Sequence, residues 1–538
     1  MKPSLACRIV PFGLSLLFLT ACAKRETSVQ AGLRTQTLLV GNHDEPADLD
    51  PHVALAVGEG NIMLTLFEGL TAEGDAGEAV PAAAERWDMS ADGLTYTFHL
   101  RPHLRWSNGD PVVADDFVSS FQRMLSPKMG AEYSYMLWPI KGAKRFNKGI
   151  LTDFSQVGVN APDRQTLRLT LEHPTPYLPL LAAHFTWLPV HGPTLAKFSA
   201  QVQRGTRWTR AGNLVGNGPF TLTEWTPNAR VVVTKNPHYW DTAHVRLNRV
   251  VFYPIESSTT EENNFRAGQL HVTWDLPMAK VPAYRAKSPT PMGLCRMIGT
   301  DFLRFNVAHA PLGDPRVRRA LGLAIDRETM ARVVTHGTRP AALALTPPQC
   351  GGYTPRARVD YDPAAAQRLL AEAGYPNGKG WPSISLQTFS GEINRTRLEA
   401  LQAMWRRELG IQVTVDSFDL KTLLQNLQAK RYGIGLAGWI ADFPDPASFL
   451  ELFVTDGGNN WTGWSNARYD ALIARAKHTA DPAARFEVFQ QAEALLLEEA
   501  PITPLDHLTR AYLVHSSVKG WAPSVLGYYR YKSVSLEP

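Results

Sequence analysis

The chain has 538 residues, of which 44% are hydrophobic and 20% are charged, and its formal net charge is +5. This composition is that of an ordinary folded protein and excludes long disordered regions, and the length predicts roughly three to four domains. So small a charge on so long a chain excludes the strongly basic surface that a nucleic-acid-binding protein needs.

The first 21 residues predict a cleaved signal peptide. Two basic residues precede an apolar run over residues 9–19, which is shorter than the about 20 residues that a membrane span needs. The run ends in Leu-Thr-Ala-Cys at residues 19–22, which resembles the lipobox of bacterial lipoproteins. We therefore expect Cys22 to carry a lipid anchor, with ordinary secretory cleavage near Ala21 as the alternative. The polar residues 22–36 are expected to form a tether on the extracytoplasmic or periplasmic face of the cell envelope.

Strand and helix signals are mixed through the first half of the chain. Alternating apolar residues predict half-buried strands, and the spacing of Phe117, Phe121 and Leu125 predicts one face of an amphipathic helix. The predicted strands cover residues 37–40, 95–100, 166–171, 220–225, 230–235, 249–253 and 270–274, and the predicted helices cover residues 61–66, 117–125 and 261–266.

After residue 300, strands and helices alternate, which predicts a largely parallel sheet covered by helices on both faces. Asp-Pro pairs at residues 314–315, 362–363 and 481–482 predict helix starts, with Asp as the N-cap. A helix over residues 393–409 would end at Gly410. Ligands of such sheets bind beyond the carboxyl ends of the strands. The predicted strands cover residues 302–307, 384–389, 411–415 and 432–437.

Two carboxylates follow the last of these strands and are not equivalent. Asp445 precedes Pro446 and an apolar turn, so we expect it to cap a helix. Asp442 lies between Ala441 and Phe443, in the least polar part of the loop, where a buried carboxylate needs a partner. That partner could be a protein arginine, a backbone turn or the cation of a ligand. The position of Asp442 beyond a strand end is typical of a ligand-binding residue, so a ligand stays open beside the two protein partners.

No motif in the sequence predicts catalysis or cofactor binding. There is no Gly-x-Ser-x-Gly nucleophile elbow and no His-Glu-x-x-His zinc helix. The 15 histidines have no metal-ligand spacing. We therefore expect a binding protein without a metal or cofactor rather than an enzyme, although a missing motif does not exclude catalysis.

Several short motifs occur in a fixed order along the mature chain, and each alone is only a turn or a helix cap. They are residues 48–52 (DLDPH), 66–70 (LFEGL), 96–101 (YTFHLR), 106–112 (WSNGDPV), 237–240 (PHYW), 314–321 (DPRVRRAL) and 369–375 (LLAEAGY). Together they are specific. The sequence resembles the solute-binding lipoproteins of bacterial ABC peptide importers, the oligopeptide- and dipeptide-binding family, also called extracellular solute-binding protein family 5.

The resemblance implies an α/β fold of two lobes that close like a clamshell, the type II periplasmic-binding-protein fold, with an additional small mixed α/β domain. Lobe 1 would comprise residues 37–67, 193–298 and 510–538, the additional domain residues 68–192, and lobe 2 residues 299–509. It also implies a monomer that captures short peptides between the lobes and delivers them to the transmembrane subunits of an ABC permease.

The resemblance further implies where a peptide binds. In the family, the residue that matches Asp442, after the motif Ala-Gly-Trp-x-Ala, binds the α-amino group of the ligand. Gly438, Trp439 and Ile440 of that motif would line the site, and Tyr133 matches a tyrosine of the family's pocket.

The carboxylate end of the site departs from the family pattern. Leu436 stands where the family has an arginine and Asn394 where it has a histidine, and both family residues can receive the peptide's carboxylate. We expect Arg395, beside Asn394, to take over this role. Leu420 and Leu55 likewise replace a tryptophan and a glutamate.

The cysteines also differ from the family pattern. The family's disulfide pair falls at Gly299 and Ile440, so both partners are missing together. Cys295 and Cys350 would lie outside the cytoplasm, where a disulfide can persist. Their spacing does not show whether they meet in space, so a bridge and two free thiols are both open.

Other functions fit part of these observations. The cargo could be a murein peptide, a nickel chelate or an opine, because the carboxylate end has been rebuilt. The protein could instead capture peptides for a sensor at the cell surface. It could also be a secreted hydrolase on the same scaffold, which would need a nucleophile and a base together in the cleft.

Overall fold

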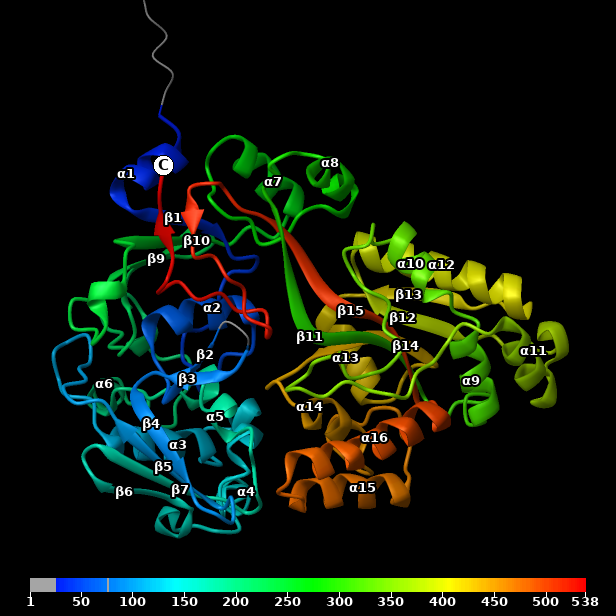
Figure 1. The fold of residues 1–538 in the computed structure, drawn as a ribbon, viewed down its shortest axis with the longest axis horizontal. Coiled ribbons are helices and arrows are strands. Elements are labelled where there is room, and N and C mark those ends of the chain that lie inside the picture. Colours follow the sequence, from blue (N-terminus) through cyan, green and yellow to red (C-terminus); the bar gives the residue numbers. More distant parts are fainter. Residues whose placement is uncertain (1–25, 75–76) are drawn as a thin grey trace, which may run out of the picture.

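A computed structural model describes residues 26–74 and 77–538 of the chain. The signal peptide and the expected lipidation site, Cys22, lie outside the described residues. The protein has two lobes that lie side by side, and the long strands β11 (Met292–Phe305) and β15 (Ile502–Leu513) run from one lobe into the other (Figure 1).

Lobe 1 contains a four-stranded sheet in the order β1-β10-β9-β8, in which β1 is parallel to β10 and the other neighbours are antiparallel. The predicted strand over residues 270–274 does not form, and Val272 makes only isolated bridges, to Val40 and Val514. The elements of this lobe are β1 (Thr37–Gly41), α2 (Val57–Leu66), β8 (Phe220–Thr226), β9 (Arg230–Lys235), β10 (Arg249–Tyr253), α7 (Ser258–Arg266), α8 (Val281–Arg285), β16 (Val518–Lys519) and β17 (Ser535–Leu536).

The segment before β1 is helical, which corrects the expectation that residues 22–36 form only a tether. Helix α1 (Ser28–Thr35) begins with a capping box in which Thr27 and Gln30 each bond the other's main chain. Val29 is buried, and Leu33 packs against the core of lobe 1. The capping pair and the apolar residues four apart, Val29 and Leu33, are visible in the sequence. They cover little more than one helical turn, which is too short to predict a helix.

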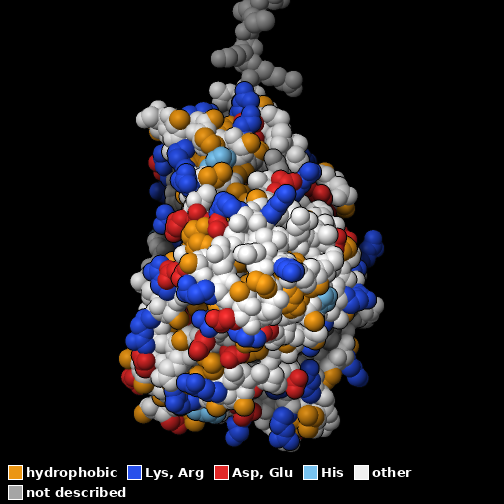
Figure 2. Space-filling view, turned by 90° about the vertical axis from the view of Figure 1, so that its right-hand side faces the viewer, with side chains coloured by type: hydrophobic (Ala, Val, Ile, Leu, Met, Phe, Trp, Pro, Cys, Tyr) orange, Lys and Arg blue, Asp and Glu red, His pale blue; other side chains and the backbone are white. Residues whose placement is uncertain are grey.

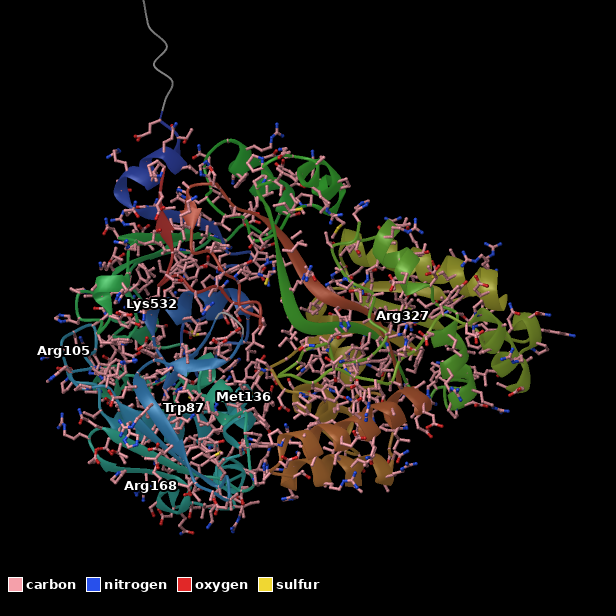
Figure 3. All side chains as sticks on the ribbon, viewed as in Figure 1. Trp87, Arg105, Met136, Arg168, Arg327 and Lys532 are labelled. Atoms are coloured by element: carbon pink, nitrogen blue, oxygen red, sulfur yellow. The ribbon has the colours of Figure 1, made fainter. Side chains whose placement is uncertain are left out.

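The additional domain has its own antiparallel sheet, in the order β4-β5-β7-β6. The predicted amphipathic helix is α3, whose Phe117, Phe121 and Leu125 are fully buried. Figure 3 places Trp87 and Arg168 in this domain. Its elements are β2 (Thr71–Glu73), β3 (Ala79–Pro81), β4 (Ala84–Met89), β5 (Thr95–Leu100), α3 (Ala114–Leu125), the 3₁₀ helix η1 (Glu132–Leu137), α4 (Ala143–Asn147), β6 (Val159–Asp163), β7 (Thr166–Thr170), α5 (Leu178–Leu181) and α6 (Gly192–Lys197).

Lobe 2 contains a five-stranded sheet in the order β13-β12-β14-β11-β15. The prediction of a largely parallel sheet is wrong for half of it: β12 is parallel to β13 and β14, whereas β11 is antiparallel to both of its neighbours. Helices α9, α11 and α16 begin at the predicted prolines, each after an aspartate N-cap. The elements are α9 (Pro315–Leu323), α10 (Arg327–Val333), α11 (Pro363–Glu372), β12 (Ser385–Phe389), α12 (Glu392–Leu409), β13 (Thr414–Phe418), α13 (Leu420–Gln428), β14 (Ile434–Ile440), α14 (Ala447–Leu450), α15 (Ala467–His478) and α16 (Pro482–Glu499).

The two long strands join the lobes. Their pairing is regular up to Arg296 opposite Thr509 and resumes at Thr300 opposite His507, with a register shift between. Residues before the shift pack into the cores of lobe 1, and residues after it pack into the cores of lobe 2. The predicted lobe boundaries, 298/299 and 509/510, fall within these strands. A register irregularity bends a strand pair, and this one lies between the two lobes.

Cys295 and Cys350 are buried free thiols. Cys295 belongs to the lobe 1 core and Cys350 to a core of lobe 2, so the structure does not form the bridge that the sequence left open. None of the described helices has the length and apolar character of a membrane-spanning segment. On the outer face of lobe 2, Lys and Arg side chains are interspersed with Asp and Glu (Figure 2), in keeping with the small net charge.

Candidate functional site

Strand β14 has one open edge that leads toward Asp442. All seven residues of β14 pair with β11, but only Ile434 and Gly435 pair with β12. From Leu436 to Ile440, one edge of β14 therefore has no strand partner among the described residues. Its main-chain N–H and C=O groups can pair with an extended ligand. The sequence placed the end of this strand at residue 437, and pairing with β11 extends it to Ile440.

Asp442 lies two residues beyond this strand. The Tyr135 hydroxyl donates a hydrogen bond to Asp442 Oδ2 at 3.1 Å, and the Asp442 N–H donates to Ser448 Oγ at 2.9 Å. Burial raises the pKa of Asp442 from 3.8 to about 7, and the Tyr135 hydrogen bond lowers it by a smaller amount. In the described part of the chain, no basic side chain forms an ion pair with the Asp442 carboxylate. The ionised carboxylate therefore has no paired positive charge to offset the cost of its burial.

Three tyrosines surround Asp442. Tyr133 and Tyr135 come from η1 of the additional domain, with ring centroids 5.7 Å apart, and Tyr528 comes from the C-terminal tail. The charge of Asp442 contributes to raising the pKa of all three hydroxyls, second to burial for Tyr133 and Tyr135. Figure 3 shows Met136, from the same segment as the first two, on the side of the additional domain that faces lobe 2. Aromatic rings can attract a cation through their faces, so this setting is compatible with an ammonium group.

The sequence identified Tyr133 but missed Tyr135 and Tyr528. The closely spaced aromatics in η1 were the only sequence signal for Tyr135. Tyr528 carries no local signal, because 86 residues of chain separate it from Asp442 and only the fold brings them together.

The neighbouring carboxylate, Asp445, is already paired. Arg485 donates to both of its oxygens, at 2.7 and 2.8 Å, and both side chains are buried. Asp445 Oδ1 also accepts from the Ala447 N–H at 2.9 Å, but the N-cap of α14 is Pro446, so the prediction that Asp445 is the N-cap is one residue out. Asp442 is therefore the carboxylate of this loop that remains available for a ligand.

Contacts between the additional domain and lobe 2 lie next to Asp442. The rings of Tyr177 and Phe443 stack with centroids 4.4 Å apart and an angle of 6° between them. The Arg485 guanidinium lies 5.3 Å from the centre of the Tyr177 ring. These contacts, with the hydrogen bond from Tyr135, hold the two parts together around the carboxylate.

Three residues are candidates for the carboxylate end of the ligand: Leu436, Asn394 and Arg395. The structure does not bring them together into one binding site. Leu436 is fully buried in a core of lobe 2. Asn394 is buried and uses its amide internally, donating to Phe389 O at 3.1 Å and accepting from Arg397 at 3.2 Å. The Arg395 side chain is 80% exposed and pairs with Glu399. The arginine that meets Asn394 is thus Arg397, which the sequence analysis did not single out.

A cavity of about 610 Å³ opens between the additional domain and lobe 2. Its lining includes Trp87, Leu180, Met297 and Pro444 but not Asp442. We take Asp442 rather than this cavity as the candidate site, because a half-buried carboxylate without a counter-charge, beside an open strand edge, carries specific chemistry and a largely apolar hollow does not. No group of three or more His, Cys, Asp or Glu side chains that could hold a metal ion occurs in the described residues.

Comparison with known proteins identifies the family. A family model described as "Bacterial extracellular solute-binding proteins, family 5 Middle" matches residues 78–461. The chain belongs to this family. It is similar to the probable deoxycholate-binding periplasmic protein YgiS of Escherichia coli, with 33% identity over 90% of each chain. It is also similar to the oligopeptide-binding protein OppA of Bacillus subtilis, with 32% identity over 90% of each chain.

A solved structure of the E. coli murein tripeptide binding protein MppA superposes with a TM-score of 0.82 at 31% identity, covering 93% of this chain and 98% of that one. The fold is therefore the two-lobed clamshell of periplasmic binding proteins. The resemblance seen in the sequence is confirmed at the level of both family and fold.

Proposed function

We propose that this member of family 5 is the substrate-binding lipoprotein of an ABC importer for short peptides. A peptide would bind between the lobes, with its main chain paired to the open edge of β14 and its α-amino group held by Asp442. The observation that carries the proposal is the continuity of these two features, an unpaired strand edge over residues 436–440 that leads to a half-buried carboxylate without a cation.

Main-chain pairing gives affinity without demanding particular side chains, which suits a transporter of varied peptides. The tyrosines around Asp442 would add cation–π attraction for the amine. The family consists of substrate-binding proteins, and we propose no enzymatic activity for this chain. Lipid attachment at Cys22, a monomeric state and delivery of the ligand to permease subunits belong to the same proposal.

The experiment that tests this function is mass spectrometry of the ligand that co-purifies with the mature protein. Calorimetry with matched peptides would follow, one with a free amine and one N-acetylated. We expect peptides to co-purify and the acetylated peptide to bind at least thirtyfold more weakly. A co-purified bile acid, such as the relative YgiS is named for, with no measurable peptide binding would replace the proposal with a non-peptide cargo.

A further inference from the structure

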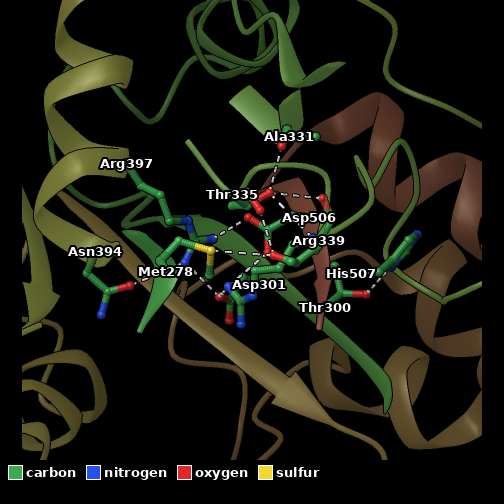
Figure 4. Close-up of polar contacts among 11 residues, drawn as sticks. Met278, Thr300, Asp301, Ala331, Thr335, Arg339, Asn394, Arg397, Asp506 and His507 are labelled. Atoms are coloured by element: carbon green, nitrogen blue, oxygen red, sulfur yellow. Dashed lines mark hydrogen bonds and ion pairs between the residues drawn. The ribbon is translucent and has the colours of Figure 1, made fainter. Parts of the chain in front are cut away.

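Four charged side chains, of which three are buried and one is partly exposed, form a closed group in lobe 2, close to the open edge of β14 (Figure 4). We call Asp301, Arg339, Arg397 and Asp506 the ionic quartet. Arg397 donates to Asp301 at 2.8 Å and to Asp506 at 2.7 Å. Arg339 donates to the same two carboxylates at 2.8 and 3.0 Å.

With all four groups ionised the quartet holds two positive and two negative charges, and each carboxylate pairs with both arginines. Asp301 on β11 stands opposite Asp506 on β15, a pairing in which two carboxylates alone would repel. Each arginine bridges both aspartates, and the four side chains are only 1–16% exposed. Burial alone would raise the pKa of Asp301, but the two arginines outweigh it and hold the pKa below its usual value. For Asp506, burial outweighs the arginines and raises the pKa of the carboxyl.

Two contacts place the quartet beside the proposed binding site of the peptide. A Cβ added to Gly438, on the open edge of β14, would lie 2.1 Å from Asp301 Oδ1, so this carboxylate lies against the glycine. Arg397 also donates to Asn394 at 3.2 Å. Gly438 is four residues before Asp442, and an extended chain covers about 3.3 Å per residue. A peptide held at Asp442 and paired along β14 would bring roughly its third to fifth residue to the quartet.

Two other arginines in the described part of the chain lie near this end. Arg395 is exposed and pairs with Glu399. Arg304 is buried without a carboxylate partner among the described residues; it donates to Ala437 O and lies over the Phe302 ring, on the face of β11 opposite to Asp301. Leu420, the first residue of α13, is an exposed apolar residue, at 54% exposure. Helix α13 begins at Leu420, directly after β13. Strands β12 and β13 are parallel, so both end at the same edge of the sheet, and Asn394 follows β12 at this edge.

We propose that the quartet sets the specificity of this site, so that it selects peptides by their amine and favours a neutral far end over a free carboxylate. The inference rests on the proposed peptide-binding function. A ligand carboxylate beside the quartet would be a third anion facing two arginines whose donors are already shared by two aspartates. The excess charge would be desolvated without a partner. Amidated peptides, and peptides long enough for their carboxylate to leave the cleft, avoid this penalty.

The test compares tri-, tetra- and pentapeptides of one uncharged sequence, each with a free amine, as free acids and as C-terminal amides. Calorimetry at pH 7.5 should show the amide binding at least tenfold more tightly than the acid at one or more of these lengths. Acids that bind as tightly as amides at every length would overturn the inference while leaving the peptide function intact. If neither form binds at any length, the proposed function fails as well.

The variant Asp506→Asn keeps the shape of the quartet but leaves one positive charge in excess. We expect it to shift the acid-to-amide affinity ratio toward the acid by at least tenfold. Glu399→Gln is the matched control, because it removes an exposed carboxylate from the same helix as Arg397, and its ratio should equal that of the wild type. Circular dichroism checks that the variants fold. If Asp506→Asn does not fold, the ratio in the wild type decides the question alone.

Discussion

Replacing Asp442 with asparagine tests the centre of the proposed site. Asparagine keeps the shape of the side chain and its hydrogen bond to Tyr135, but removes the charge. Burial raises the pKa of Asp442 from 3.8 to about 7, which corresponds to about 4 kcal/mol of electrostatic cost for the ionised form. A ligand ammonium in contact with the carboxylate can offset much of this cost. We expect the variant to lose about 2–4 kcal/mol of binding free energy, or roughly thirty- to a thousandfold in affinity.

The same site predicts a dependence of binding on pH. Because the pKa of Asp442 is raised, its carboxyl is protonated below about pH 7, and an amine must then displace a proton to bind. Between pH 8 and pH 6 the affinity of the wild type should fall by about tenfold on this account. For folding the sign is opposite: the folded state holds this proton more tightly than the unfolded state, so the group favours folding more as the pH falls from 7 to 4.

The assay is calorimetric titration of an amidated peptide with a free amine, at pH 6, 7 and 8, into wild-type protein and Asp442→Asn. An amidated peptide leaves the α-amino group as its only titrating group, and that amine begins to lose its proton near pH 8. The variant should bind weakly and lose the decrease in affinity toward pH 6. If Asp442→Asn binds within threefold of the wild type at pH 8, where the wild-type carboxylate is ionised, the amine is held elsewhere and the site assignment is refuted.

Two further predictions concern packing and covalent structure. Gly438→Ala should lower the free energy of unfolding by about 1–3 kcal/mol, because its Cβ would lie 2.1 Å from the Asp301 carboxylate. Gly458→Ala is the control: no atom lies within 4 Å of its added Cβ, so the free energy of unfolding should change little. Urea denaturation of both variants measures the difference. Cys295 and Cys350 should both react in a thiol count on denatured, unreduced protein, and a count of none would show that they form a bridge.

The sequence by itself determined the features that depend on a few neighbouring residues. Strands β5, β9 and β10 lie at their predicted residues, because alternation of apolar side chains is a local signal. The helices after the Asp-Pro pairs begin where expected, because an N-cap and a proline at the first turn act within that turn. Asp442 stood out for the same reason, as a carboxylate in an apolar loop directly after a strand.

Only the tertiary structure decided which distant segments meet. Strand β14 continues to Ile440 because it pairs with β11, and β11 enters the sheet antiparallel because it arrives from the other lobe. Tyr135 and Tyr528 reach Asp442 from opposite ends of the chain. The ion pairs of Asp301, Arg339, Arg397 and Asp506 each join residues that are far apart in the sequence (Figure 4). The periodicity of apolar residues and the helix caps report only on neighbouring residues. Long-range contacts depend instead on how segments far apart in the sequence pack against one another.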